Sequence, residues 1–241
     1  MNMQKVWMAV LLCVVATPGA AREPGGGAPD SLADLPLVEV RPAGATDRLA
    51  VFYSGDGGWA ALDKGVSERL ADAGVTVIGV NSLRYFWSGR KPDQAAHDLA
   101  RLIDAYLLPE HGQLLLIGYS TGADVLPFLV NRLPVGLRAR VTSIALIAPG
   151  HDTAFEIHVA DWLPGSGTRG TPLLPEIERL GQPVLCLYGK GDTSALCPDL
   201  PAQRGTTQQI GAGHHLGEQY ATISARILAF SSVITTAGAG R

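Results

Sequence analysis

The sequence predicts an α/β fold in which a mostly parallel central sheet is flanked by helices, and three observations support this. Runs of apolar, β-branched residues alternate with stretches of helical spacing along most of the chain. Several runs are apolar at every position, which is typical of parallel strands that helices cover on both faces. Glycine-rich turns with polar side chains follow the runs. Such sheets bind ligands at the carboxyl ends of their strands, so functional residues are expected just after each strand.

The expected strands and helices follow from these patterns. Leu37–Ala43 alternates between apolar and polar residues, as an edge strand does. Further strands are expected over Arg48–Ser54, Val75–Val80, Gln113–Ser120, Val141–Pro149, Pro183–Gly189 and Thr206–Ala212. Helices are expected over Trp59–Gly74, Pro92–Leu108, Gly122–Leu133 (kinked or shifted by Pro127) and Glu218–Phe230. A proline at a helix start and a glycine at a helix end are common helix signals.

Composition limits the class of protein. The chain has 241 residues, of which 46% are hydrophobic and 17% are charged, and its formal net charge is −3. This length provides one full-sized hydrophobic core and scarcely two. Neither the net charge nor any run of Lys and Arg indicates binding to nucleic acid.

The N-terminal residues have the pattern of a secretory signal. Lys5 precedes an apolar stretch from Val6 to Ala16, and the small residues TPGAA follow. The stretch is too short for a permanent membrane anchor, so we expect a signal peptide over 1–21 and a periplasmic mature protein. A flexible leader (22–36), the α/β domain (37–234) and a flexible tail (235–241) are expected to follow.

A candidate nucleophile lies between the fourth expected strand and the helix after it. GYSTG, residues 118–122, has the G-x-S-x-G pattern of a nucleophile elbow, and its strand–turn–helix setting separates it from a chance match. This setting favours the α/β-hydrolase fold, with Ser120 exposed above the sheet. The alternative is that Ser120 merely caps a helix.

A serine nucleophile needs a base and an acid that orients the base. In this fold they follow the serine in the order Asp/Glu, then His. Asp192 follows the strand PVLCLYG, and His214 and His215 follow the strand TTQQIGA. We expect His214 to be the base because it directly follows a glycine turn, and His215 to pack against the loop. No histidine spacing indicates a metal site, and no cofactor is expected.

Cys186 and Cys197 flank Asp192 in the sequence. An exported protein can form disulfides, and two cysteines this close make a bridge plausible. The bridge would close a short loop that carries the acid. The alternative is a pair of unrelated buried thiols.

The segment SGDGGW, residues 54–59, predicts an oxyanion loop. A phosphate-binding loop would need a following Lys-Ser/Thr, and a calcium loop would need more oxygen ligands than Ser54 and Asp56 supply. In the α/β-hydrolase fold, this loop and the residue after the nucleophile supply the two oxyanion-binding N–H groups. We therefore expect the backbone of Asp56 and Thr121 to bind the oxyanion, with Gly57 next to it. Whether Trp59 packs below the loop or lines the pocket stays open.

Two further segments carry candidate substrate-binding residues. Tyr85, Phe86 and Trp87 are expected in a loop at the rim of the site, flanked by Arg84 and, further on, by Arg90 and Lys91. Aromatic side chains with basic neighbours suit an amphiphile with an anionic phosphate, or a membrane surface. It is equally consistent with the sequence that the aromatic residues cover the sheet edge. Residues 151–180 are expected to form a small cap segment, in which Asp161 and Trp162 are candidate pocket residues.

Taken together, the segments YSGDGGW, LRYFWSGRKP, GYSTGADVLPF, CLYGKGDTSALCP and GHHLG resemble the bacterial virulence protein VirJ/AcvB family of exported α/β-hydrolases. The resemblance covers about Phe52 to Tyr220. It implies a periplasmic serine hydrolase with a triad of Ser120, Asp192 and His214. It also implies action on aminoacylated phosphatidylglycerol and a connection with secretion-system proteins.

The sequence leaves alternatives for the function. The same triad serves thioesterases, amidases and peptidases, because it does not select the acyl group. A non-catalytic binding protein or secretion chaperone on a hydrolase scaffold is the alternative from another class.

Overall fold

The computed structural model describes residues 29–108, 111–157 and 170–238. The expected signal peptide and the candidate pocket residues Asp161 and Trp162 lie outside these ranges. Within them, no helix is both long enough and apolar enough to cross a membrane.

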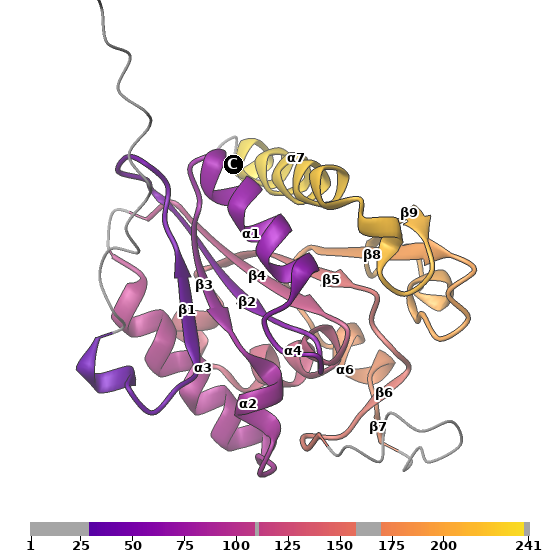
Figure 1. Ribbon diagram of the computed structural model, residues 1–241, viewed down its shortest axis with the longest axis horizontal. Helices are drawn as coiled ribbons and strands as arrows, with labels where there is room; N and C mark the ends of the chain where they lie inside the picture. The colour runs from indigo at the N-terminus through magenta and orange to yellow at the C-terminus, as the bar shows by residue number, and fades with distance from the viewer. Residues whose placement is uncertain (1–28, 109–110, 158–169, 239–241) are drawn as a thin grey trace, which may run out of the picture.

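A twisted sheet of seven strands forms the centre of the protein (Figure 1). In spatial order its strands are β1 (Leu37–Val40), β3 (Thr76–Val80), β2 (Arg48–Tyr53), β4 (Gln113–Tyr119), β5 (Val141–Ile147), β8 (Val184–Lys190) and β9 (Thr206–Ala212). All neighbours pair in parallel except β1, which is antiparallel to β3 at the edge. The expected α/β fold with a mostly parallel sheet is confirmed. β6 (Asp152–Thr153) and β7 (Thr171–Pro172) form a separate small ribbon.

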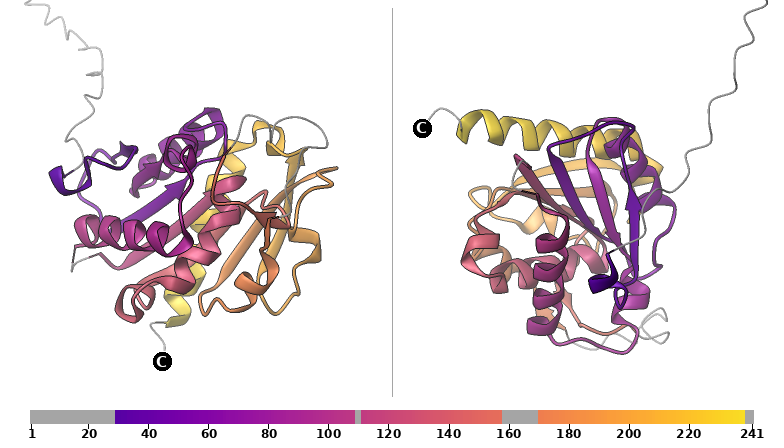
Figure 2. Two further views of the ribbon diagram at one scale, coloured as in Figure 1. Left: turned by 90° about the horizontal axis from the view of Figure 1, so that it is seen from below. Right: turned by 90° about the vertical axis from the view of Figure 1, so that its left-hand side faces the viewer.

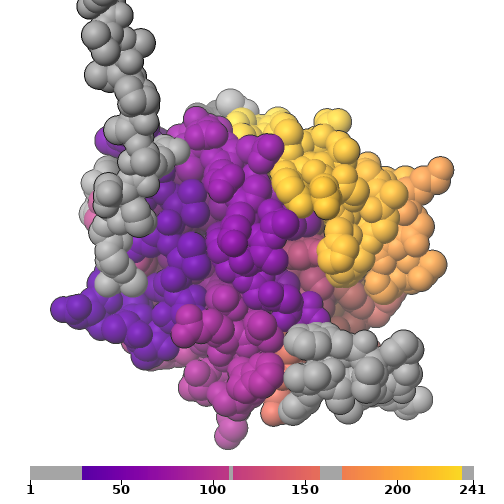
Figure 3. All heavy atoms as spheres, in the orientation of Figure 1, coloured from indigo at the N-terminus to yellow at the C-terminus, as the bar shows by residue number. Residues whose placement is uncertain are grey.

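Helices cover both faces of the sheet, as the two views of Figure 2 show. On one face α1 (Ala61–Asp72) lies beside α7 (Tyr220–Gly238), and the two adjoin at the surface in Figure 3. On the other face lie α3 (Pro92–Tyr106) and α4 (Thr121–Arg132), which runs through Pro127. The shorter helical segments are η1 (Asp30–Leu32), α2 (Ser82–Phe86), α5 (Val135–Arg138), α6 (Leu174–Glu178), η3 (Cys197–Asp199) and η4 (Leu216–Glu218).

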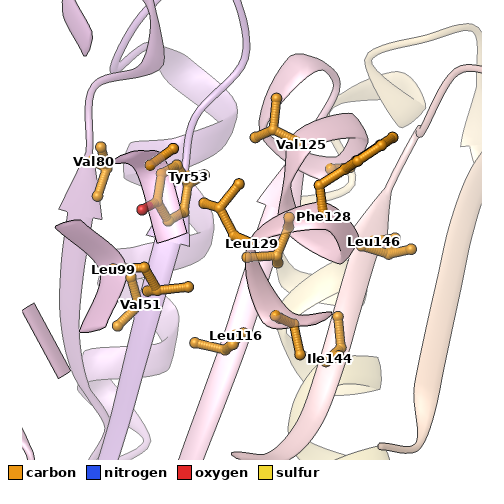
Figure 4. Packing of buried hydrophobic residues seen from close by; sticks show 14 of the residues in the cluster. Val51, Tyr53, Val80, Leu99, Leu116, Val125, Phe128, Leu129, Ile144 and Leu146 are labelled. Carbon is orange, nitrogen blue, oxygen red and sulfur yellow. The ribbon is translucent and has the colours of Figure 1, made fainter. Parts of the chain in front are cut away.

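Each face of the sheet has its own hydrophobic core. Figure 4 shows the core on the α3/α4 side, where strand residues such as Val51 and Leu116 pack against Leu99, Phe128 and Leu129. The core on the other side joins the sheet to α1 and α7. Because both faces are covered, a ligand site is expected at the carboxyl ends of the strands, as in other sheets of this kind.

Two of the expected domain boundaries are corrected at the chain ends. Leu32, in the expected leader, is 1% exposed and belongs to the core. Arg101 holds this segment by donating hydrogen bonds to both Asp34 carboxylate oxygens and to the Ser31 carbonyl. At the other end α7 extends to Gly238, past the expected domain end at 234. The buried Leu32 and the hydrogen bonds from Arg101, which is 67 residues from Asp34, hold this segment in place. The local Gly/Pro composition does not reveal such contacts.

Candidate active site

Ser120 sits in a strained turn between β4 and α4. Its φ of 51° and ψ of −122° are unusual for a residue other than glycine. The turn is tight: a β-carbon at Gly122 would come within 2.2 Å of the Tyr53 carbonyl oxygen, and one at Gly118 within 2.5 Å of the Gly122 oxygen. The two glycines of G-x-S-x-G therefore let the elbow close against its neighbours, and the serine is raised at the end of the strand.

A continuous chain of hydrogen bonds joins the three residues that the sequence singled out. His214 Nε2 lies 2.9 Å from Ser120 Oγ, and His214 Nδ1 lies 3.0 Å from Asp192 Oδ2. These residues come from three separate loops, after β4, β8 and β9, which parallel pairing brings to the same edge of the sheet. The geometry is that of a nucleophile, a base and an orienting acid.

The carboxylate of Asp192 is held in its ionised form. Its side chain is 4% exposed, and burial raises the pKa of Asp192. Hydrogen bonds from Ser194 and His214 outweigh burial and bring the pKa below its usual range. Ser194 donates to Oδ1 from both its hydroxyl, at 2.7 Å, and its backbone N–H, at 3.1 Å. A fixed negative charge at this place stabilises a neighbouring imidazolium.

The disulfide between Cys186 and Cys197 is confirmed, and it spans the loop of Asp192. Cys186 is buried in β8 and Cys197 is buried in η3. The bridge ties both ends of the acid loop to the core.

His215 has different contacts from His214. It is exposed, and its Nδ1 lies 2.5 Å from the hydroxyl of Tyr119, the residue before the nucleophile. His215 thus lies against the buried Tyr119, while its own side chain stays exposed. Among the described residues, the imidazole that hydrogen-bonds to both Ser120 and Asp192 is that of His214.

The loop after β2 approaches the nucleophile at Gly55. A β-carbon placed at Gly55 would lie 3.4 Å from the β-carbon of Ser120. Gly58 closes the turn by donating to the Gly55 carbonyl at 3.1 Å, which leaves Asp56 and Gly57 at the tip. Thr121 is the first residue of α4, where backbone N–H groups have no acceptor within the helix. Asp56 and Thr121 thus belong to the two segments that meet at Ser120.

Trp59 packs below this loop. A β-carbon at Gly79 would come within 2.3 Å of the Trp59 ring, and the Phe52 ring meets it edge to face at 5.6 Å. The indole rests on the sheet, which answers the question that the sequence left open.

The interpretation of Tyr85 and Phe86 as rim residues is corrected. They lie in the short helix α2, 2% and 0% exposed. The Tyr85 hydroxyl donates to Asp98 at 2.7 Å, so the apparent loop aromatics fill the core beneath α3. Trp87, in contrast, is 55% exposed, and Arg84 is exposed beside it.

Sequence reasoning missed two acids close to the candidate site, the partly buried Asp124 and the buried Asp63. Asp124, one turn after Ser120, accepts a hydrogen bond from the Gly150 N–H at 2.6 Å. Burial, helped by the charges of Asp152 and Asp56 and opposed by the Gly150 N–H, raises the pKa of Asp124 to about 8. Asp63, in the first turn of α1, is 1% exposed. In the sequence Asp124 follows Ser120 closely and Asp63 follows Trp59 closely. However, an acid in the first turn of a helix is also an ordinary helix signal, so this position alone does not indicate a functional role.

Comparison with solved structures identifies the fold. The esterase domain of a Rhodothermus marinus protein has a TM-score of 0.56 at 14% identity, covering 82% of this chain and 91% of that chain. A hydrolase from Oleispira antarctica has a TM-score of 0.58 at 14% identity, with 84% and 96% covered. MenH from S. aureus has a TM-score of 0.57 at 13% identity, with 81% and 98% covered. The fold is that of the α/β-hydrolases.

The family follows from a second comparison. The model of the family described as bacterial virulence protein (VirJ) matches residues 47–233, so the chain belongs to that family. The matched range contains the elbow, Asp192 and both adjacent histidines. A search of curated proteins found no match.

Proposed function

We propose that the protein is a serine esterase that works through a covalent acyl-enzyme. The observation that carries this proposal is the unbroken Ser120–His214–Asp192 hydrogen-bond chain at a strained elbow. His214 Nε2 accepts the hydroxyl proton as Ser120 Oγ attacks the ester carbonyl carbon. The imidazolium then gives this proton to the leaving alcohol. Water, activated by the same imidazole, releases the acid and restores the serine.

The developing oxyanion is stabilised in this proposal by the backbone N–H groups of Asp56 and Thr121. The proximity of Gly55 to Ser120 and the position of Thr121 at the start of α4 support the assignment. The N-terminus of a helix of 12 residues adds positive potential at the same place.

We further propose that the substrate is an aminoacylated phosphatidylglycerol and that the enzyme acts in the periplasm. Membership of the VirJ family, for which this substrate was expected, supports the first part. The disulfide supports an oxidising compartment. The exposed Trp87 and its neighbours Arg84 and Lys91 suit contact with an anionic lipid surface. Secretion-system partners stay a prediction of the resemblance.

Covalent labelling tests the nucleophile. A fluorophosphonate probe is expected to label the wild type and not Ser120→Ala, and His214→Ala should label much more slowly. Circular dichroism checks that each variant is folded. Folded wild type that the probe does not label would favour the non-catalytic binding protein instead.

Lipid turnover tests the substrate. Vesicles of lysyl-phosphatidylglycerol are incubated with wild type and with Ser120→Ala, and free lysine and phosphatidylglycerol are measured by mass spectrometry. We expect equimolar release with the wild type only. If simple esters are hydrolysed while this lipid is not, the esterase proposal stands and the lipid assignment is wrong.

A further inference from the structure

A cavity of about 310 Å³ lies beside the proposed oxyanion loop, on the α1/α7 side of the sheet. One wall is formed by the segment from Gly55 to Asp63, and the other by Tyr119 and the turn after His214. Gly55 connects the cavity to the nucleophile, because a β-carbon there would lie 3.4 Å from the Ser120 β-carbon. The cavity therefore adjoins the candidate active site at Gly55.

The side chains around this cavity have one sign of charge. Asp56, Asp63 and Glu218 contribute carboxyl groups, and Tyr119 and Tyr220 contribute aromatic rings. None of the lining residues, all within the described ranges, is a lysine or an arginine. Tyr220 is held by α1, since a β-carbon at Gly65 would come within 2.4 Å of its ring. Carboxylates with aromatic rings attract cations and repel anions.

Asp63 gives a second, independent indication of a ligand, because one of its carboxylate oxygens lacks a hydrogen-bond donor among the described residues. It is 1% exposed, and its Oδ2 accepts a hydrogen bond from the Ala60 N–H at 3.0 Å. Its Oδ1 is buried and accepts no well-aligned hydrogen bond in the described structure. Burial raises the pKa of Asp63 to about 6, although backbone N–H groups, including those of Ala60 and Gly55, lower it in part. A buried acceptor without a donor is costly, and a ligand N–H group would remove that cost.

The acids also act together on Tyr119. Burial raises the pKa of the Tyr119 hydroxyl, and the charges of Asp63 and Asp56 raise it further. Their negative potential therefore converges on the inner wall of the cavity, where Tyr119 stays protonated and bonded to His215.

We propose that this cavity binds a primary ammonium group on the acyl part of the ester substrate. The inference rests on the proposed esterase function. An ammonium group has three donors, which suit the orphaned Asp63 oxygen and the neighbouring carboxylates. Asp56 both lines the cavity and belongs to the proposed oxyanion loop. The carbonyl group whose oxygen enters this loop belongs to the acyl part of the substrate. We therefore expect the acyl chain to extend into the cavity.

Two matched esters test the proposal. In aminocaproyl p-nitrophenyl ester an ammonium group ends the acyl chain, and in the heptanoyl ester a methyl group replaces it. We expect the wild type to favour the amino ester about tenfold in kcat/KM, the effect of one modest charge interaction. Asp63→Asn and Glu218→Gln should each bring this ratio toward one. Glu68→Gln, which removes an exposed charge of α1 outside the cavity, should leave the ratio unchanged. A wild-type ratio near one, or one that neither cavity variant alters, overturns the proposal.

A binding measurement separates this proposal from the esterase proposal. Hexylammonium is titrated calorimetrically into Ser120→Ala, alone and combined with Asp63→Asn or Glu218→Gln. We expect binding that each added substitution weakens several-fold. If Asp63→Asn does not fold, the comparison uses Glu218→Gln, because Glu218 is exposed. Failure of the wild type to hydrolyse either ester would refute the esterase alone, whereas absent or unaltered hexylammonium binding would refute the cation site.

Discussion

At Ser120 the backbone holds a non-glycine residue at positive φ, and the proposed chemistry depends on this backbone conformation. Such a conformation costs about 1–3 kcal/mol and persists only where the surroundings enforce it. Close packing at Gly118 and Gly122 holds the Ser120 backbone in this conformation. The Ser120 N–H also donates a hydrogen bond to the Ile147 carbonyl at 2.9 Å, which fixes the orientation of the peptide. The hydroxyl therefore points at His214 before any substrate arrives, so no binding energy is used to orient it.

The two adjacent histidines predict opposite outcomes on substitution. His214→Ala should lower kcat/KM for p-nitrophenyl butyrate by at least about a thousandfold, because the base for Ser120 is lost. His215→Ala removes only the contact with Tyr119 and should retain most of the activity. The reverse pattern, with His214→Ala active and His215→Ala inactive, would assign the base to His215.

Asp124 predicts that stability depends on pH. Because burial raises its folded-state pKa to about 8, from an unfolded value of 3.8, the native state holds a proton that the unfolded state has lost between these two values. The free energy of unfolding should therefore receive its full contribution below pH 3.8 and lose it as the pH rises toward about 8. Asp124→Asn keeps an acceptor for the Gly150 N–H and removes this loss.

Urea unfolding at pH 5 and pH 8 measures the effect of Asp124. The wild type should lose more stability than Asp124→Asn between these two conditions, with equal dependence on urea. Asp104→Asn, an exposed acid of α3, serves as the matched control and should follow the wild type. An identical pH response of Asp124→Asn and wild type would show that Asp124 is already ionised in the folded protein at pH 5.

At the scale of elements, the contact between α4 and β2 positions the elbow. Gly122→Ala would push a methyl group toward the carbonyl oxygens of Tyr53 and Ser54, at 2.2 and 2.6 Å. Both are backbone atoms of the strand end and cannot move alone. Overpacking of this kind costs about 1–3 kcal/mol or more, so the melting temperature should fall by several degrees and activity should fall with it.

Gly136 in α5 is the control for this substitution, because nothing lies within 4 Å of its β-carbon position. Gly136→Ala should keep or slightly raise the melting temperature, since alanine reduces the freedom of the unfolded chain. Equal melting temperatures for Gly122→Ala and wild type would contradict the tight elbow described for α4.

The elements were largely predictable from sequence because their signals are local. The buried strands are apolar at most positions, and α3 begins at Pro92 as expected. The position of the candidate site was predictable for a related reason. Parallel strands bring Ser120, Asp192 and His214 to the same edge of the sheet, independently of the loop conformations. What failed depends on distant contacts. Tyr85 is buried, and its hydroxyl donates a hydrogen bond to Asp98, 13 residues away. The role of Asp63 depends on a cavity shared with Glu218, from the far end of the chain.

For the whole molecule, the two ends of the sheet differ in what they expose. The carboxyl ends of the strands lead to the elbow and the acid loop, and β3 leads into α2 and the exposed Trp87. The opposite end exposes Val135, at 74%, in α5, which follows α4. Trp87 has basic neighbours in Arg84, Arg90 and Lys91. An enzyme acting on a membrane lipid must face the bilayer with its active-site end, and Trp87 is suited to make that contact.

Vesicle flotation tests this orientation. Trp87→Ala should bind vesicles containing phosphatidylglycerol several-fold more weakly than wild type, because an indole at the membrane–water interface is lost. Arg84→Gln with Lys91→Gln should weaken binding in a salt-dependent way, since each basic residue contributes about 1 kcal/mol near an anionic surface. Val135→Ala removes a more exposed apolar side chain from the other end and should leave flotation unchanged. A loss with Val135→Ala equal to that with Trp87→Ala would mean that general hydrophobicity drives binding. Equal flotation of all variants, with lipid turnover intact, would place the membrane contact on another surface.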